Sequence, residues 1–176
     1  EYAIHQLTSA GAAGIVFDLR GTAGGSLDAA VECVSLIVPE GDVVSAQYKD
    51  GTAQVLGSSD AHELDLPMTV LVNSGTSYSA ELFAATVRDF EKGRVVGVKT
   101  AGKGTIQAEP YQLQDGSAVV ITVARMLTST GECFDGVGVA PDVEYALTAE
   151  QEQKLLTVPF YFFPFVAQDL ATGTLK

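Results

Sequence analysis

The chain has 176 residues, a mass of 18.4 kDa and a hydrophobic content of 47%, values that predict one compact domain able to bury a core. Its formal net charge of −12 would repel a polyphosphate backbone, which argues against nucleic acid as a partner. No apolar run approaches the roughly 20 residues needed to cross a bilayer, and no signal-peptide pattern opens the chain. It begins in helical sequence without a Met, as expected of a mature product or an excised piece.

The first third of the chain alternates helix and strand, the pattern of an α/β fold. Apolar residues at helical spacing over 3–7 predict a helix that ends at Gly11. The run 15–19 is apolar enough to predict a strand covered on both faces. A second helix is expected to start at Ser26, and Cys33 within it is expected to be a small buried side chain.

A hairpin and a helix are predicted next. Two alternating runs, 43–48 and 52–56, flank Asp50-Gly51, a dipeptide typical of tight hairpin turns. The segment 68–72 predicts another buried strand. A third helix is expected from Ser79, with Lys92 in its last turn and Gly93 as its cap.

The last third returns to strands. Val95-Val96 predicts a strand, and the runs 105–113 and 117–127 flank a second Asp-Gly turn. The segment 141–143 is expected to complete the core. A short helix near 149–156 and the aromatic run 158–166 are expected to pack on that core, although such a run can also be a docking surface.

The two cysteines and two histidines predict little chemistry. Cys33 and Cys133 form no Cys-x-x-Cys unit, so free thiols are favoured over a zinc site, a redox pair or a disulfide. His5 lies off the apolar face of the first helix and His62 lies in an acidic loop. Neither is placed for a Ser-His-Asp triad.

Three segments carry residues suited to acyl transfer without histidine. Arg20–Gly25 is a glycine-rich strand-to-helix turn that can present backbone N–H groups to an oxyanion, although such turns are often only local geometry. Asn73–Glu81 has the layout of a nucleophile elbow, although Ser79 also suits a plain helix cap. Lys103, between two glycines, can act as a general base if it is removed from water and is otherwise solvated.

Nucleotide binding is excluded by the sequence around the same lysine. The stretch from Gly97 to Lys103 matches a phosphate-binding loop, but Gly104 stands where Ser or Thr should hold magnesium. Thr105 onward alternates like a strand, whereas that loop should open a helix.

Taken together and in this order, the segments resemble the core of the C-terminal processing (tail-specific) peptidases, a serine-type family with a Ser-Lys dyad on a fold akin to crotonases and Clp proteases. The similarity extends from residue 1 to about residue 146. The motifs that carry it are Gly14–Gly25, Val70–Thr76, Ser79-Ala-Glu81, Gly97 with Thr100–Gln107, Thr122–Arg125 and Gly136–Val143.

This resemblance implies roles for individual residues. Lys103 matches the general base, and Gln107 matches the residue that orients it. Gly24 matches one backbone donor of the oxyanion hole, and the N–H of Ser79 matches the other. Counting from Glu81 and from Lys103 leads in both cases to Tyr78 as the nucleophile position.

A phenol is a poor nucleophile there, because its oxygen lies several bonds farther from the backbone than a serine oxygen does. Two hypotheses follow. Ser79 or Ser77 attacks with Lys103 as base, and the chain is a working peptidase; or Tyr78 makes the domain a degenerate relative that binds peptides or other ligands without cutting. A crotonase-type thioester enzyme would require an acidic catalytic residue and a coenzyme A surface, and nothing in the sequence clearly supplies either.

The expected protein is therefore α/β, with a crotonase- or Clp-like core of mixed β-sheet and packed helices over 1–146, and a helix with an aromatic tail over 147–176. Protein or peptide substrates, no cofactor and no metal are expected. The resemblance implies an extracellular or cell-envelope location. The family commonly carries a PDZ module, and its absence here suggests truncation or a minimal variant.

Overall fold

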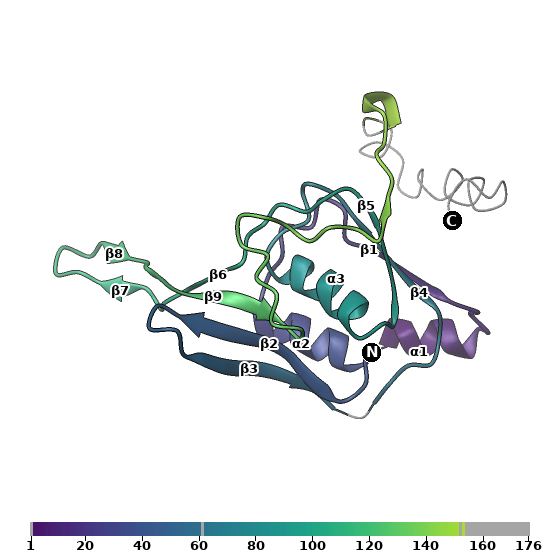
Figure 1. The fold of residues 1–176 in the computed structure, drawn as a ribbon, viewed down its shortest axis with the longest axis horizontal. Coiled ribbons are helices and arrows are strands. Elements are labelled where there is room, and N and C mark those ends of the chain that lie inside the picture. The colour runs from purple at the N-terminus through teal and green to yellow at the C-terminus, as the bar shows by residue number, and fades with distance from the viewer. Residues whose placement is uncertain (1, 61, 152, 154–176) are drawn as a thin grey trace.

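A computed structural model describes residues 2–60, 62–151 and 153. Within these residues a 4-stranded parallel sheet and a 4-stranded antiparallel sheet are present, and Figure 1 shows helix α3 (Ser79–Asp89) at the centre of the molecule. The α/β class with mixed strand directions is confirmed.

The parallel sheet places three sequence motifs at one edge. Its order is β1 (Ile15–Asp18), β4 (Met68–Val72), β5 (Gly93–Gly97) and β10 (Val143–Glu144). The glycine turn (Arg20–Gly25) follows β1, and the elbow (Asn73–Glu81) follows β4. The loop 98–104, which contains Lys103 and is called the lysine loop below, follows β5. Because β1, β4 and β5 are adjacent and parallel, their carboxyl ends meet at the same edge of the sheet, and so do the three motifs.

The antiparallel sheet has the order β3 (Ala53–Ser59), β2 (Gly41–Tyr48), β9 (Thr122–Thr128) and β6 (Thr105–Gln107). A two-stranded arm, β7 (Tyr111–Gln112) with β8 (Ala118–Val119), extends from it and projects away from the rest of the molecule at the left of Figure 1.

The core lies around α3. This helix contacts β4 and β5 of the parallel sheet and β9 of the antiparallel sheet, while α2 (Leu27–Ser35) packs on α3 and β3. Residues 79–87 of α3 are all buried, as expected for a helix covered on all sides. Helix α1 (Tyr2–Ser9) has no buried residue. The fully buried apolar side chains include Val34, Val70, Leu82, Val95 and Met126.

Local signals at helix starts and hairpin turns are confirmed. Ser26 is the N-cap of α2, and its side chain accepts a hydrogen bond from the N–H of Ala29 at 3.3 Å. Gly51 and Gly116, in the two Asp-Gly turns, have φ values of +87° and +85°. These are conformations that glycine adopts without steric cost.

Two burial predictions are wrong. The first strand is not covered on both faces: β1 is the edge strand of its sheet, and Val16, which points to one face, is 46% exposed. The outer face of this sheet is covered farther along, where Leu71 and Val96 pack against Val143 and neighbouring apolar residues. Cys33 is exposed rather than buried, since it lies beside the exposed Ala29 and Glu32, just outside the buried stripe of α2 that contains Val34. Both cysteines are free, as predicted.

The third helix ends earlier than predicted, at Asp89. Glu91 adopts a φ of +56°, and the N–H of Lys92 donates to the carbonyl of Val87 at 3.0 Å, which is the hydrogen bond of a Schellman motif. A glutamate therefore occupies the left-handed position expected of a glycine. Gly93 begins β5 instead of capping the helix.

The long hairpin predicted over 105–127 is divided into two pieces. The first run breaks between β6 and β7, at a stretch that contains Pro110, and the second breaks between β8 and β9. A proline has no N–H to donate to a strand ladder, so pairing is interrupted there. The inner halves join the antiparallel sheet, and the outer halves form the arm.

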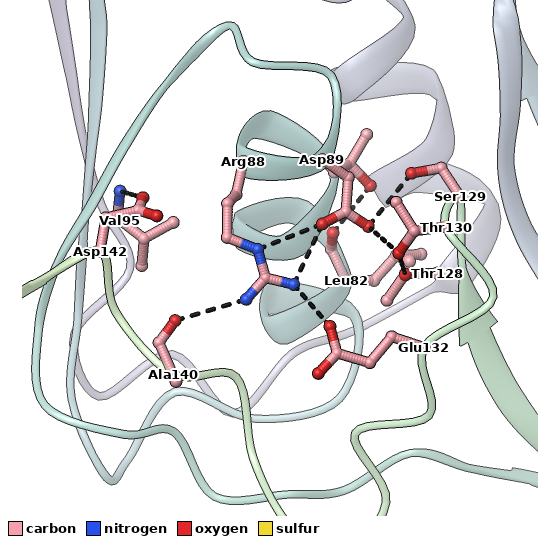
Figure 2. Close-up of polar contacts among 11 residues, drawn as sticks. Leu82, Arg88, Asp89, Val95, Thr128, Ser129, Thr130, Glu132, Ala140 and Asp142 are labelled. Atoms are coloured by element: carbon pink, nitrogen blue, oxygen red, sulfur yellow. Dashed lines mark hydrogen bonds and ion pairs between the residues drawn. The ribbon is translucent and has the colours of Figure 1, made fainter.

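A polar cluster at the end of α3 fixes the segment 128–142 (Figure 2). Arg88 forms ion pairs with Asp89 at 3.0 Å and with Glu132 at 2.9 Å. The hydroxyls of Ser129 and Thr130 donate to Asp89, whose side chain is 3% exposed. These bonds hold the start of the segment against α3, so the loop that follows has a fixed position beside the lysine loop.

Within the described part of the chain, no helix has the length and apolar character required to span a membrane. Residues 149–151 and 153 are helical, where a short helix is predicted. The rest of that predicted helix and the aromatic run 158–166 lie outside the described residues. The expected division of the chain near residue 146 stays a prediction.

Candidate functional site

The glycine turn is held directly against the elbow. The N–H of Ser77 donates to the carbonyl of Thr22 at 2.9 Å, and the hydroxyl of Ser77 donates to the carbonyl of Ala23 at 2.9 Å. The Ser79 hydroxyl accepts from the N–H of Gly25 at 2.8 Å and lies 3.3 Å from its carbonyl oxygen. The two motifs predicted from separate parts of the sequence are therefore hydrogen-bonded neighbours.

Gly24 lies where no larger residue fits. A Cβ atom at this position would lie 2.6 Å from the carbonyl oxygen of Ser77 and 3.0 Å from both the backbone nitrogen of Ser79 and the Cβ of Tyr78. Its φ of +84° is also one that side chains disfavour. This close approach brings the backbone of Gly24 beside the start of α3, where an oxyanion hole is predicted.

Tyr78 occupies the central position of the elbow. It is the N-cap of α3 and has φ +57° and ψ −120°, outside both the helical and the extended regions. Such a conformation costs about 1–3 kcal/mol and persists only where surrounding contacts impose it. A strand-to-helix turn with one strained residue before the helix is the geometry of a nucleophile elbow. The ring of Tyr78 is partly buried and packs against the main hydrophobic core.

The flanking serines are buried, with relative exposures of 3% for Ser77 and 4% for Ser79. In the structure their hydroxyls bond to the glycine turn, as described above. Both side chains therefore link the elbow to the glycine turn.

Glu81 joins the elbow to the lysine loop. Its side chain is fully buried, and its carboxylate accepts hydrogen bonds from the N–H groups of Tyr78 at 2.9 Å, Gly102 at 2.7 Å and Lys103 at 2.8 Å. The hydroxyl of Thr100 donates to the same carboxylate. Four donors surround this carboxylate, so its hydrogen-bonding capacity in the interior is met by the protein.

A second carboxylate supports the loop from the other side. Asp135 accepts from the N–H of Gly104 at 3.2 Å, and the N–H of Gly136 donates to the carbonyl of Gly102 at 2.9 Å. A Cβ on Gly104 would lie 2.8 Å from the backbone nitrogen of Asp135, so a larger residue would separate the two loops. Three consecutive N–H groups, those of residues 102–104, thus bond to protein carboxylates.

The backbone of Lys103 is fixed, and the residue is exposed. Its hydrogen bonds to other described residues involve the backbone. The structure therefore brings the lysine loop to the elbow through Glu81. A proton-sharing contact between the Lys103 amine and a hydroxyl stays a prediction.

Gln107 lies on β6 with its amide directed to two threonines. The Nε2 atom lies 2.9 Å from the hydroxyl oxygen of Thr122 and 3.2 Å from that of Thr105. The structure places Gln107 in this threonine pair rather than in a bond with Lys103. Its orienting role stays a prediction.

Sequence reasoning missed Glu81, Thr100 and Asp135 as parts of the site. In the sequence Glu81 belongs to the elbow and marks the count to the nucleophile position, but no role was assigned to its carboxylate, because a glutamate in the first turn of a helix is common on protein surfaces. Its burial beside the lysine loop depends on how α3 and β5 pack together. Within the described residues, no group of three His, Cys, Asp or Glu side chains is arranged to hold a metal ion.

Comparison with known proteins decides the family. Residues 1–145 match the profile described as "Peptidase family S41". The chain belongs to this family. The match ends close to residue 146, where the resemblance in sequence ends.

Two curated relatives carry informative names. The chain is 35% identical over 174 residues to the carboxyl-terminal-processing protease of Synechocystis sp., covering 98% of this chain and 40% of that protein. It is 37% identical over 146 residues to the chloroplastic C-terminal processing peptidase of Tetradesmus obliquus, covering 82% of this chain and 31% of that protein. The chain thus spans less than half the length of these relatives.

A solved structure supports the fold. The photosystem II D1 C-terminal processing protease superposes with a TM-score of 0.77 at 36% sequence identity, over 82% of this chain and 38% of that one. The expected S41-type core, akin to crotonases and Clp proteases, is confirmed.

Proposed function

We propose that this chain is the core of a serine-type C-terminal processing peptidase, which hydrolyses peptide bonds of protein substrates by acyl transfer with Lys103 as general base. The observation that carries the proposal is the Glu81 carboxylate, which accepts from the N–H groups of both Tyr78 and Lys103. One buried carboxyl group thereby holds the elbow and the lysine loop together, as preorganised catalysis requires.

Ser79 is the proposed nucleophile. Its hydroxyl donates to the Gly25 carbonyl over 3.3 Å, whereas the hydroxyl of Ser77 donates to Ala23 over 2.9 Å. The longer hydrogen bond is the weaker one, so the proton of Ser79 is released to a base at the lower cost. A rotation about the Cα–Cβ bond of Ser79 would break this bond and free the oxygen for attack.

The proposed reaction uses groups that the fold already holds in place. Lys103 takes the hydroxyl proton as Ser79 attacks the substrate carbonyl, and then passes it to the leaving amine. The N–H groups of Gly24 and Ser79 stabilise the oxyanion at the positively polarised end of α3. Water then attacks the acyl-enzyme by the same route in reverse.

A second function, peptide binding without cleavage, is favoured by one specific observation. The strained position of the elbow holds a phenol, and the hydroxyls of Ser77 and Ser79 bond to the glycine turn. In that case the site retains its donors and its lysine loop but has no hydroxyl in the attacking position.

We also propose a location outside the cytoplasm, in the cell envelope or an equivalent compartment. The relative from Tetradesmus obliquus is named as chloroplastic. Fusion of the complete protein to a reporter, followed by fractionation, tests this proposal, and recovery only in the cytoplasm would refute it.

The decisive experiment compares single variants on one unstructured protein substrate. If Ser79 attacks, the wild type cuts, and Ser79→Ala and Lys103→Ala each lower the rate about 1,000-fold, as loss of a nucleophile or its base does. Ser77→Ala is the matched control, because it also removes a hydroxyl that bonds to the glycine turn.

Two other outcomes separate the alternatives. An inert wild type that gains cleavage on Tyr78→Ser supports peptide binding without hydrolysis as the function of the natural chain. Full activity in Lys103→Ala refutes lysine as the base in either case.

A further inference from the structure

A hollow of about 580 Å³ lies beside the lysine loop, on the side of the antiparallel sheet that faces away from α3. It is lined by β2 and the turn after it, by β6 and β9, and by the loop that contains Asp135. Lys49 and Arg125 are both in its wall. Nothing in the peptidase mechanism above uses these two residues.

Strand register places a row of polar side chains along this hollow. Arg125 of β9 pairs with Gln47 of β2 on one side and with Thr105 of β6 on the other. Directly opposed residues of neighbouring antiparallel strands point to the same face of a sheet. Arg125 and Gln47 are exposed, whereas Ala124 and Met126 face the core. The row therefore lies on the open face.

The hollow lies close to the lysine loop of the proposed active site. Thr105 is two residues after Lys103, and β6 is the edge strand of its sheet. Asp135 links the two regions, since one of its oxygens accepts from the N–H of Gly104 and the other lies 4.0 Å from the Nε of Arg125. Arg125 lies opposite Thr105 in strand register, so a peptide that extended from the lysine loop along β6 would pass near its side chain.

The charge of the hollow is opposite to that of the whole chain. The chain carries a net charge of −12, whereas the Lys, Arg, Asp and Glu residues that line the hollow are Lys49, Arg125 and Asp135, two cations against one carboxylate. The carboxylate of Asp50, next to Lys49, is already bonded to the N–H and the hydroxyl of Thr52. A local positive site in an acidic protein attracts an anionic group.

The guanidinium group of Arg125 has N–H donors that can bind a ligand. Its side chain is 67% exposed, and its ion pair with Asp135 is at the outer distance limit, where such pairs contribute about 0–1 kcal/mol. A guanidinium group offers several N–H donors in a fork that matches the two oxygens of a carboxylate. The geometry thus favours a carboxylate as the ligand.

We propose that Arg125, assisted by Lys49, binds a carboxylate of the peptide substrate and so selects substrates that carry this group a few residues from the scissile bond. This inference rests on the proposed function in naming the peptide as a substrate. The carboxylate is either the C-terminal one or that of an Asp or Glu side chain, and the peptides below distinguish these sources.

The test measures peptide affinity, so that it does not depend on cleavage. Three peptides of one sequence are compared by titration with the full chain carrying Lys103→Ala: one with a free C-terminus and an internal Glu, one with the C-terminus amidated, and one with Glu replaced by Gln. We expect one of the two neutralised peptides to bind about tenfold more weakly, which identifies the carboxylate that is bound.

Arg125→Gln is expected to lower the affinity for the unmodified peptide about tenfold and to leave the affinity for the weaker peptide unchanged. Arg94→Gln is the matched control, since it removes the same charge from an exposed position on β5, outside the hollow. Equal affinities for the three peptides, equal effects of the two arginine variants, or no measurable binding of any peptide would overturn the proposal. Failure of the proposed function would appear separately, as binding with this pattern but no cleavage by the wild type.

Discussion

Glu81 is the residue on which the geometry of the site depends most. Its carboxylate is fully buried and satisfies the N–H groups of Tyr78, Gly102 and Lys103. Hydrogen bonds to a charged group are worth about 1.5–3 kcal/mol each, and donors left unpaired in the interior add a further cost. A glutamate on the surface of a helical first turn does not make this many buried hydrogen bonds.

We expect Glu81→Gln to lower the free energy of unfolding by about 3 kcal/mol, because an amide has one acceptor oxygen and brings an NH₂ group toward N–H donors. Urea denaturation measures this loss. Glu32→Gln, an exposed change on α2, is the control and should stay within about 0.5 kcal/mol of the wild type. Equal stability of the two variants would show that the carboxylate does not hold the loops.

The sequence identified individual residues of the candidate site, but it did not predict their burial or their contacts. The lysine, the glutamine and the elbow were recognised in the sequence because motif spacing along the chain identifies them. Cys33 was misplaced because a short helix of nine residues has an apolar stripe broad enough to include a residue at its margin. The role of Glu81 was missed because three of its four partners, Thr100, Gly102 and Lys103, lie 19 to 22 residues away along the chain.

The two Asp-Gly turns share one device. In each, the aspartate accepts from the N–H and the hydroxyl of the residue two positions later: Asp50 from Thr52 and Asp115 from Ser117. The hydrogen bond from the hydroxyl, and after it the one from the N–H, hold the pKa of both carboxyls below the ordinary value of 3.8. Both turns are therefore tightened by the ionised form of their aspartate.

The sign of the pH effect follows from this direction. A pKa that is lower in the folded state means that the stabilisation is complete above pH 3.8 and is lost as the pH falls through the folded-state value. We expect Ser117→Ala to raise the pKa of Asp115 toward 3.8 in an NMR titration and to leave Asp50 unchanged. Thr52→Ala is the reciprocal control. A shift of both carboxyls in either variant would contradict this assignment.

Helix starts and turns were predicted correctly where neighbouring residues in the sequence determine them. The Ser26 cap and both Asp-Gly turns depend on nearby residues, and they form where the sequence indicates. The end of α3 was not predicted correctly, because Glu91 adopts a left-handed conformation that is unusual for a glutamate. The division of the hairpin predicted over 105–127 was also not predicted, because it depends on which part of the hairpin pairs with the antiparallel sheet.

Across the whole molecule, burial is concentrated around α3 and absent from the arm. Met126 on β9 is fully buried, whereas Tyr111 and Ile121 in and beside the arm are 71% and 59% exposed. In Figure 1 the arm projects away from the rest of the molecule. Its side chains are therefore expected to contribute little to global stability.

We expect Met126→Ala to cost about 2–5 kcal/mol, since it leaves a cavity between β9 and α3. Tyr111→Ser and Ile121→Ser should each change the free energy of unfolding by less than about 0.5 kcal/mol. Urea midpoints measured on the three variants test this division. A large loss in either arm variant would mean that the arm packs against a surface in solution.

The shared anchor at Glu81 also bears on how the site opens. The amides of Tyr78, Gly102 and Lys103 end on the same carboxylate, so none of them can be exposed to solvent without disturbing the bonds of the others. Deuterium would then enter all three positions through one common fluctuation of the native state, with similar protection factors. The site, although built from two distant stretches of chain, would form and open as one cooperative unit.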